Sequence, residues 1–244
     1  MRSTLAPTII KFADENKNKL SKYGIFEIGR VWDAIDENNL AVEKKKLALV
    51  VASDSDSEKD LYFRLKEIVE YISSHIMHIS VDYLGKTENK LYHPVNSCSI
   101  SSNGIVLGEM GIMHPVISKN IDKRKNFAVL ELDVEKMLEV EKNKFKVKQT
   151  SKFQSVSLDY NFVASKDMKY GEIEKALNEF RASFILEHSL KDIYINEETL
   201  PGKISYTINF NVTPKDRTLE ASDIEKFSSR LIDHMKRIGV ELRS

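Results

Sequence analysis

The chain has 244 residues, more than the roughly 100 to 200 of an average domain, so two packed units are expected. Hydrophobic residues make up 41% and charged residues 30%, with only 9 Gly and 5 Pro, which is typical of a globular protein and excludes a disordered one. The 37 basic residues balance the 37 acidic ones, so the overall charge does not indicate a nucleic-acid partner.

The first half is expected to form a sheet covered by helices. Residues 1–19 contain one early Arg and then mainly polar residues, which excludes a signal peptide or membrane helix and favours a cytoplasmic protein. Gly29 lies inside a strand pattern and indicates close approach of another segment. The expected elements are a helix over 5–18 opened by Pro7, strands over 24–32 and 46–52, an amphipathic helix over 60–72, and strands over 79–84, 97–101 and 104–112.

Cysteine and histidine residues give no sign of a metal site. The single cysteine, Cys98, excludes a disulfide framework and is expected to be a buried structural thiol. His75, His78, His93 and His114 have no carboxylate or Cys at metal-ligand spacing, so they are interpreted as structural or surface residues. The sequence contains no Walker loop and no GxSxG motif.

A lysine-rich segment, 139–152, has almost no apolar pattern and predicts the boundary between two domains, 1–145 and 150–244. It is either a solvated linker or a basic strap on RNA phosphates, and charge runs are more often solvated surface.

The second half predicts the order β-α-β-β-α-β, the ferredoxin-like arrangement with both helices on one face of the sheet. A capping box of Ser222 and Glu225 is expected at the start of the last helix. The expected elements are strands over 156–164, 184–195 and 203–212, helices over 170–180 and 223–238, and a last strand over 240–243.

The third of these strands has one apolar and one polar face. Because Asn is depleted in strands, a face made of Ser, Thr and Asn is unusual, and RNA-recognition sheets present such groups to bases. An ordinary solvated face is the competing interpretation. The apolar face contains Ile204, Tyr206, Ile208, Phe210 and Val212, and the polar face contains Ser205, Thr207, Asn209 and Asn211.

Five short motifs occur in order in the second half: FQSVSLD at 153–159, DIY at 192–194, GKIS at 202–205, RTL at 217–219 and LR at 242–243. In these motifs and their order the second half resembles the C-terminal anticodon-binding domain of bacterial phenylalanyl-tRNA synthetase β chains. Gln154 departs from the family's usual proline, and Glu197 and Glu198 make the segment between Tyr194 and Gly202 acidic, so the loop near RNA is expected to differ.

The first half resembles the same β chain, through RSTLAP at 2–7, FEIGRV at 26–31 and GEMGIMHP at 108–115. The resemblance implies an α+β protein, with a class II synthetase-like antiparallel sheet and helices followed by the ferredoxin-like domain. The family's β chain is much longer, so this sequence is expected to be part of one.

The resemblance implies a catalytically inactive first module. The equivalent of the ATP-binding Gly-x-Gly-x-x-Arg motif falls at 130–135, where Leu130 and Leu132 replace the glycines and Glu135 replaces the Arg. Bulky side chains would fill a nucleotide pocket and carboxylates would repel phosphate. Glu27 and Arg30 remain without their partners. No cofactor is therefore expected in this chain, although the parent ligase uses ATP and Mg.

The function implied by the resemblance is that of a non-catalytic β-subunit fragment of phenylalanine-tRNA ligase, an aminoacyl-tRNA synthetase of protein biosynthesis. It would pack on the catalytic α subunit in an (αβ)2 heterotetramer and bind the anticodon of phenylalanine tRNA. The expected packing residues are Phe26, Ile28 and Trp32, and the expected anticodon-binding residues are Asp192, Tyr194, Ser205, Arg217 and Arg243.

A purely structural scaffold without RNA contact is the alternative. Residues 151–244 contain 14 basic and 15 acidic side chains, whereas most nucleic-acid binders are clearly basic.

Overall fold

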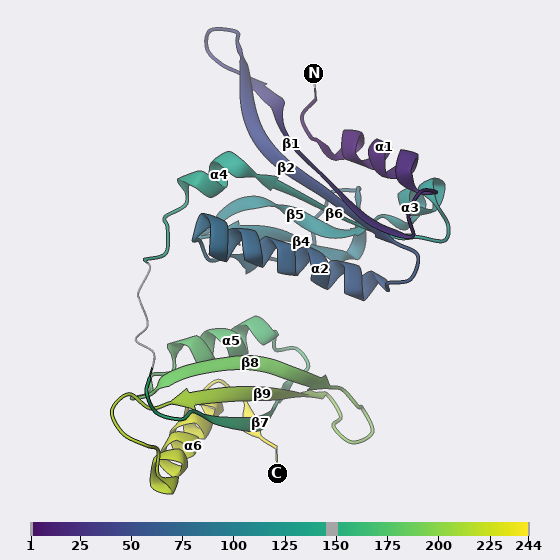
Figure 1. The fold of residues 1–244 in the computed structure, drawn as a ribbon. Helices are drawn as coiled ribbons and strands as arrows, with labels where there is room; N and C mark the ends of the chain where they lie inside the picture. Colours follow the sequence, from purple (N-terminus) through teal and green to yellow (C-terminus); the bar gives the residue numbers. More distant parts are fainter. Residues whose placement is uncertain (1, 145–150, 244) are drawn as a thin grey trace. The chain divides into compact units, whose positions relative to one another are not determined.

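The computed structural model describes residues 2–144 and 151–243. They fall into two compact units, one within Met1–Phe145 and one within Lys146–Ser244 (Figure 1). The division lies inside the lysine-rich segment 139–152, of which residues 145–150, with Lys146 and Lys148, lie outside the described residues. No helix in the described part of the chain is long and apolar enough to cross a membrane.

The first unit is built on a six-stranded antiparallel sheet in the order β1-β2-β6-β5-β4-β3. Its strands are β1 (Lys22–Ile35), β2 (Ala41–Ser53), β3 (Asp82–Tyr83), β4 (Tyr92–Ser102), β5 (Ile105–Met113) and β6 (Asn126–Asp133). Its helices are α1 (Ala6–Asn16), α2 (Glu58–Tyr71), α3 (Pro115–Ile121) and α4 (Val134–Glu139), and the short π-helix η1 (Ile72–Met77) continues α2.

Each face of this sheet has its own core, because successive side chains of a strand point to opposite faces. On one face Leu61 and Leu65 of α2 pack with Leu130 and Leu132 of β6. On the other face Leu5 and Ile9 pack with Val50 and Val129. Strand β6 is therefore covered on both sides (Figure 1).

The hairpin of β1 and β2 extends beyond the rest of the sheet, as Figure 1 shows. Residues 46–53 of β2 pair with β6, whereas residues 41–45 pair only with β1. At its tip, Asp36 Oδ1 accepts the backbone N–H groups of Asn38 and Leu40 at 2.9 and 2.8 Å, and Asn39 has φ 64°. This local bonding closes the turn.

Two expectations for the first unit need correction, and a third is confirmed. The strand expected over 79–84 contains only Asp82 and Tyr83. Strand β6 was not predicted, because a strand buried on both faces has no alternating pattern. The expectation at Gly29 is confirmed: a Cβ there would lie 2.8 Å from Arg2 Nη2 and 3.1 Å from Leu5 Cδ2.

The second unit has the predicted β-α-β-β-α-β order. Its strand order β10-β7-β9-β8 is antiparallel throughout and is that of a ferredoxin-like sheet. Both helices pack on the apolar face, where Phe162, Phe210 and Phe227 are buried. The elements are β7 (Val156–Ser165), α5 (Tyr170–Glu179), β8 (Ile185–Tyr194), β9 (Lys203–Thr213), α6 (Ala221–Lys236) and β10 (Glu241–Leu242).

The cap of α6 differs from the prediction. Glu220, two residues before Ser222, is the N-cap, and Asp223 accepts its backbone N–H at 3.0 Å. Arg217 donates to both carboxylate oxygens of Asp223, at 2.7 and 2.8 Å. Because this pair holds the first turn, the helix begins before the predicted capping box of Ser222 and Glu225.

Candidate nucleic-acid interface

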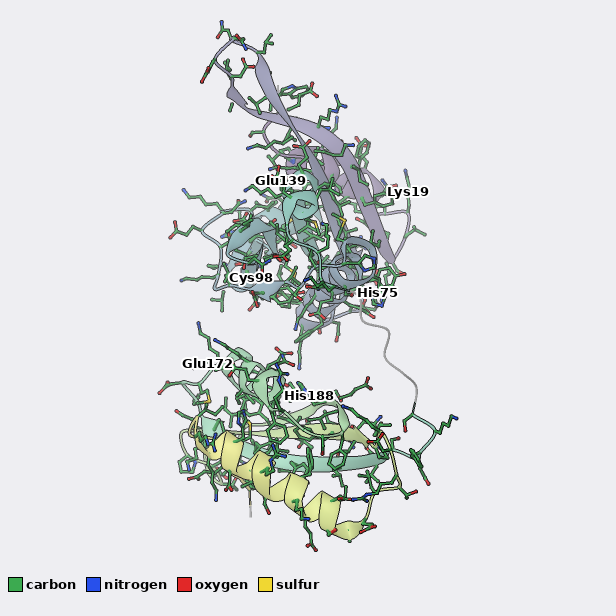
Figure 2. The ribbon with its side chains drawn as sticks, turned by 90° about the vertical axis from the view of Figure 1, so that its left-hand side faces the viewer. Lys19, His75, Cys98, Glu139, Glu172 and His188 are labelled. Carbon is green, nitrogen blue, oxygen red and sulfur yellow. The ribbon has the colours of Figure 1, made fainter. Side chains whose placement is uncertain are left out.

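The open face of the four-stranded sheet is the candidate site. It is the face opposite α5 and α6, and it carries the polar side of β9, as the sequence predicts. Figure 2 shows the side chains of the unit and labels Glu172 on α5 and His188 on β8. His188 lies on the helix-covered face, where its ring is 6.1 Å from that of Phe210. Burial lowers the pKa of His188 below its usual 6.5.

A β-bulge in β8 decides which side chains reach the open face. Leu190 pairs with Ile208, but Asp192, two residues on, pairs with Thr207, so Lys191 is the extra residue. Because a one-residue shift exchanges the faces of a strand, Leu190 packs in the core while Asp192 and Tyr194 point to the open face. Strict alternation would have put all three on one side.

Four of the five predicted anticodon-binding residues come together in two adjacent rows across this face. One row runs through Glu241, Val163, Ser205 and Tyr194. In the next row, Arg243 donates its backbone N–H to Asn161 at 2.7 Å, and this row continues through Thr207 to Asp192.

The side chains in these rows differ in accessibility. Tyr194 is 38% exposed, and its hydroxyl lies 3.2 Å from that of Thr199. Ser205 is only 2% exposed. Asp192 is exposed, and its side chain has no hydrogen bond or ion pair with any residue that the structure describes. The guanidinium of Arg243 lies 5.2 Å from the centre of the Tyr194 ring.

A polar network covers the neighbouring part of the face. Asn209 Nδ2 donates to Asp159 at 2.6 Å and to Ser157 at 2.8 Å, and Lys191 Nζ lies 2.6 Å from Asp159. The hydrogen bond from Asn209, followed by that from Lys191, lowers the pKa of the Asp159 carboxyl. Asp159 and Lys191 were not predicted as site residues. The alternation of β7 places Asp159 on this face, whereas the bulge that brings Lys191 to it interrupts the alternation of β8 and cannot be read from the sequence.

Arg217, the fifth residue, lies elsewhere. It follows the end of β9 at Thr213, whereas Ser205 is near the start of that strand, about 26 Å away at 3.3 Å per residue. Its guanidinium is bound by Asp223, as described above. The structure therefore separates Arg217 from the cluster of Tyr194, Asp192, Ser205 and Arg243.

In the first unit, the positions of the expected nucleotide motif are filled. Leu130 and Leu132 are fully buried in the α2-side core. Glu131, between them, faces the other side, where its carboxylate accepts from the Thr4 hydroxyl and from Leu5 N–H at 3.0 Å and pairs with Lys46 at 2.7 Å.

A pocket of about 480 Å³ adjoins this carboxylate. It is lined by Glu131 and, from the neighbouring strand, Glu109, which lies directly opposite Glu131 in the ladder. Glu109 accepts hydrogen bonds from the Thr87 hydroxyl and from Asn89 Nδ2. Lys46, the partner of Glu131, also lines the pocket, so two carboxylates face one cation and no net positive charge attracts a phosphate.

The predicted packing residues are on the outer strand β1. Phe26 and Ile28 are 70% and 59% exposed and pair with Leu49 and Leu47 of β2. They share the α2 side of the sheet, where Leu47 and Leu49 join the core that α2 covers. Trp32 is half-buried.

The cysteine and the motif histidines have structural surroundings. Cys98 is buried, as predicted; it accepts a hydrogen bond from the Tyr62 hydroxyl at 3.3 Å, and burial raises its pKa. His93 and His114 each accept backbone N–H groups within the next three residues, so both order the turn around the following proline. Among the described residues, no group of three or more His, Cys, Asp or Glu side chains is arranged to hold a metal.

Comparison with known proteins adds two family matches. Residues 1–134 match the model described as the phenylalanyl tRNA synthetase beta chain CLM domain. Residues 151–243 match the ferredoxin-fold anticodon binding domain.

Similar whole proteins are phenylalanine–tRNA ligase beta subunits. The one from Clostridium acetobutylicum is 26% identical over 247 residues, which cover 100% of this chain and 30% of the relative. That of Syntrophotalea carbinolica is 26% identical over 252 residues, with 100% and 31% covered. The Bacillus subtilis protein is 23% identical, with 95% and 30% covered. The chain thus spans about 30% of the length of these relatives. Since the first model matches more than half of its residues and the second most of the remainder, the chain belongs to the phenylalanyl-tRNA synthetase β-chain family.

Proposed function

We propose that the open face of the second unit binds the anticodon of phenylalanine tRNA. The observation that carries the proposal is the clustering of Tyr194, Asp192, Ser205 and Arg243 in two adjacent rows. These residues come from three separate motifs and are brought together only by the sheet. The similarity of this unit to an anticodon-binding domain supports the same conclusion.

Each side chain has a role that its chemistry suits. The Tyr194 ring stacks on the first anticodon base. The unpaired carboxylate of Asp192 accepts hydrogen bonds from the ring N–H and amino group of a guanine, and the Ser205 hydroxyl donates to its O6. Arg243 neutralises a nearby phosphate. Arg217 contacts the RNA backbone farther from the anticodon base. It can do so only through those guanidinium N–H groups that its pairing with Asp223 leaves free.

Binding of labelled phenylalanine tRNA to the 244-residue chain tests this proposal. Tyr194→Ala is expected to weaken binding by about 1 to 3 kcal/mol, the size of one base–aromatic stack, while Tyr194→Phe retains most of the affinity. Asp192→Asn is expected to reduce the preference for guanine over adenine at the first anticodon position. Arg217→Ala is the matched control: it removes a cation of the same unit and changes affinity without changing base preference.

If Tyr194→Ala and Asp192→Asn both leave affinity and base preference unchanged, the anticodon proposal is wrong. A chain that assembles with an α subunit but binds no tRNA would instead be a structural scaffold, for which the near-neutral charge of residues 151–244 is the supporting feature.

We further propose that the first unit is a non-catalytic module that packs on the catalytic α subunit of an (αβ)2 ligase. Its residues do not fit ATP, because Leu130 and Leu132 are core residues where the nucleotide motif has glycines, and the adjoining pocket has two carboxylates for one lysine. The module therefore contributes surface to the assembly, and the ATP and Mg of the parent enzyme belong to another chain. Titration calorimetry of this chain with Mg-ATP is expected to show no binding; micromolar affinity would overturn the proposal.

A further inference from the structure

The contact between Arg243 and Tyr194 joins two opposite edges of the sheet. Arg243 follows β10 and Tyr194 ends β8, and both β7 and β9 lie between them. Since neighbouring strands are about 4.8 Å apart, the two backbones are separated by roughly 14 Å. The guanidinium is nevertheless 5.2 Å from the ring centre. The two side chains must therefore lean over the intervening strands and meet above the open face.

The residues beneath this contact are unusually buried for an uncovered sheet face. Ser205 is 2% and Val163 7% exposed, and they are the two central residues of the row that ends at Tyr194. In the next row, by contrast, Asn161 and Asp192 are exposed. Of these two rows, burial is confined to the one that ends at Tyr194, toward which the Arg243 side chain leans from the neighbouring row.

The contact is also of a kind that opens easily. The Arg243 side chain has no ion pair with any carboxylate in the described part of the chain, and the nearby Glu241 carboxylate is 3.7 Å from Lys203. Cation–π contacts at solvent-exposed sites are weak. The guanidinium therefore holds the Tyr194 ring without being fixed to it.

We propose that Arg243 is a lid over the base-binding face. In the free chain its guanidinium occupies the face of the Tyr194 ring on which a base would stack and covers Ser205. An incoming base displaces the guanidinium, uncovers the Ser205 hydroxyl and leaves the cation free to meet the RNA phosphate. This inference rests on the proposed anticodon function for its ligand, but the lid itself is a property of the free chain.

Thiol labelling tests the lid without RNA. In a Ser205→Cys variant the new thiol lies under the contact, and the natural Cys98 is buried, which keeps background labelling low. Adding Arg243→Ala is expected to raise the labelling rate of residue 205 about 2- to 5-fold, the population shift that an exposed cation–π contact produces. Arg243→Lys, which keeps the charge but lacks the planar group, is expected to give an intermediate rate. Lys175→Ala, which removes an exposed cation of α5 on the helix-covered side of the sheet, is the control and leaves the rate unchanged.

A Val163→Cys variant repeats the measurement if Ser205→Cys fails to fold, because Val163 lies under the same contact. Equal labelling rates with and without Arg243 would overturn the lid. Addition of a GAA-loop RNA hairpin to the Val163→Cys variant, which keeps both Ser205 and Arg243, forms a separate arm, in which the bound hairpin is expected to lower the labelling rate of residue 163. Loss of protection together with an Arg243-dependent labelling rate would contradict the anticodon proposal and leave the lid intact.

Discussion

At the scale of single residues, the glycines of the Gly-x-x-Gly-x-x-His-Pro motif have a packing role. A Cβ on Gly108 would lie 2.1 Å from the Glu131 carbonyl oxygen, and one on Gly111 would lie 2.7 Å from that of Asn96. Both contacts are with backbone, which cannot move aside cheaply. The motif that identifies the family in sequence therefore builds the centre of the sheet, between β4, β5 and β6.

Gly108→Ala is accordingly expected to destabilise the chain by about 1 to 3 kcal/mol or more, because the neighbouring strand must shift. Gly85→Ala is the control, since nothing lies within 4 Å of its added Cβ. Denaturant unfolding of both variants measures the difference. Equal midpoints for the two variants would show that β5 and β6 are not packed as closely as described.

His188 makes the stability of the second unit dependent on pH. Burial beside Phe210 lowers its folded-state pKa below 6.5, so the unfolded chain binds the proton more readily than the folded one. Its contribution to stability is therefore complete above pH 6.5 and is lost as the pH falls from 6.5 through the lower, folded-state pKa. Glu174 opposes the shift but does not reverse it.

The expected result is that His188→Phe flattens the pH dependence of stability below pH 6.5. Hydrogen exchange of the β9 amides reports on this unit within the full chain. Parallel pH profiles for the wild type and the variant would contradict the assigned burial of His188.

At the scale of secondary-structure elements, the second unit was predictable because most of its strands have one covered face. The alternation in β7 and β9 gives their burial directly, and α5 and α6 have clear apolar stripes. Strand β6 has buried residues on both faces, so its sequence lacks a period and the prediction missed it. In the second unit, the sequence therefore predicted the type of those elements that bury only one face.

The site was less predictable than the elements that form it. Asp192 and Tyr194 reach the open face only through the bulge at Lys191, which no periodic pattern reveals. The contact between Arg243 and Tyr194 joins residues 49 positions apart in sequence, so no local pattern reveals it. Arg217 looked like the other candidates in sequence, and its distance from them follows from the length of β9.

At the start of α6, the structure shows a cap formed by Glu220 and Asp223, whereas the sequence predicted a capping box of Ser222 and Glu225. Asp223→Ala removes the acceptor for both Arg217 and the Glu220 N–H, and it is expected to lower the melting temperature and loosen the first turn. Glu225→Ala, which removes the residue of the predicted capping box, is expected to leave both unchanged. Calorimetry measures the melting temperature of each variant, and amide exchange at 221–224 measures the stability of the first turn. A larger effect of Glu225→Ala than of Asp223→Ala would favour the capping box of Ser222 and Glu225.

At the scale of the whole molecule, the two units divide the chemistry of the chain. The second unit presents a polar sheet face with an exposed tyrosine and a carboxylate, Asp192, that has no partner among the described residues, whereas the first presents exposed apolar side chains on its outer strand β1. The overall charge of zero reflects neither surface, because it sums the 37 basic and 37 acidic residues of the whole chain. Net charge therefore does not show how polar and apolar groups are distributed over each unit.

The apolar side chains on β1 give the last prediction. Helix α2 covers the central strands but leaves Phe26 and Ile28 exposed on the same side of the sheet. Because exposed apolar clusters on an outer strand favour association, we expect the double variant Phe26→Ser, Ile28→Ser to lose co-purification with a phenylalanine-tRNA ligase α subunit. Phe12 of α1, which is 47% exposed, provides the control: the Phe12→Ser variant is expected to retain co-purification with the α subunit. Circular dichroism establishes that the double variant is folded. Co-purification of the folded double variant at the wild-type level would place the α-subunit interface on another surface.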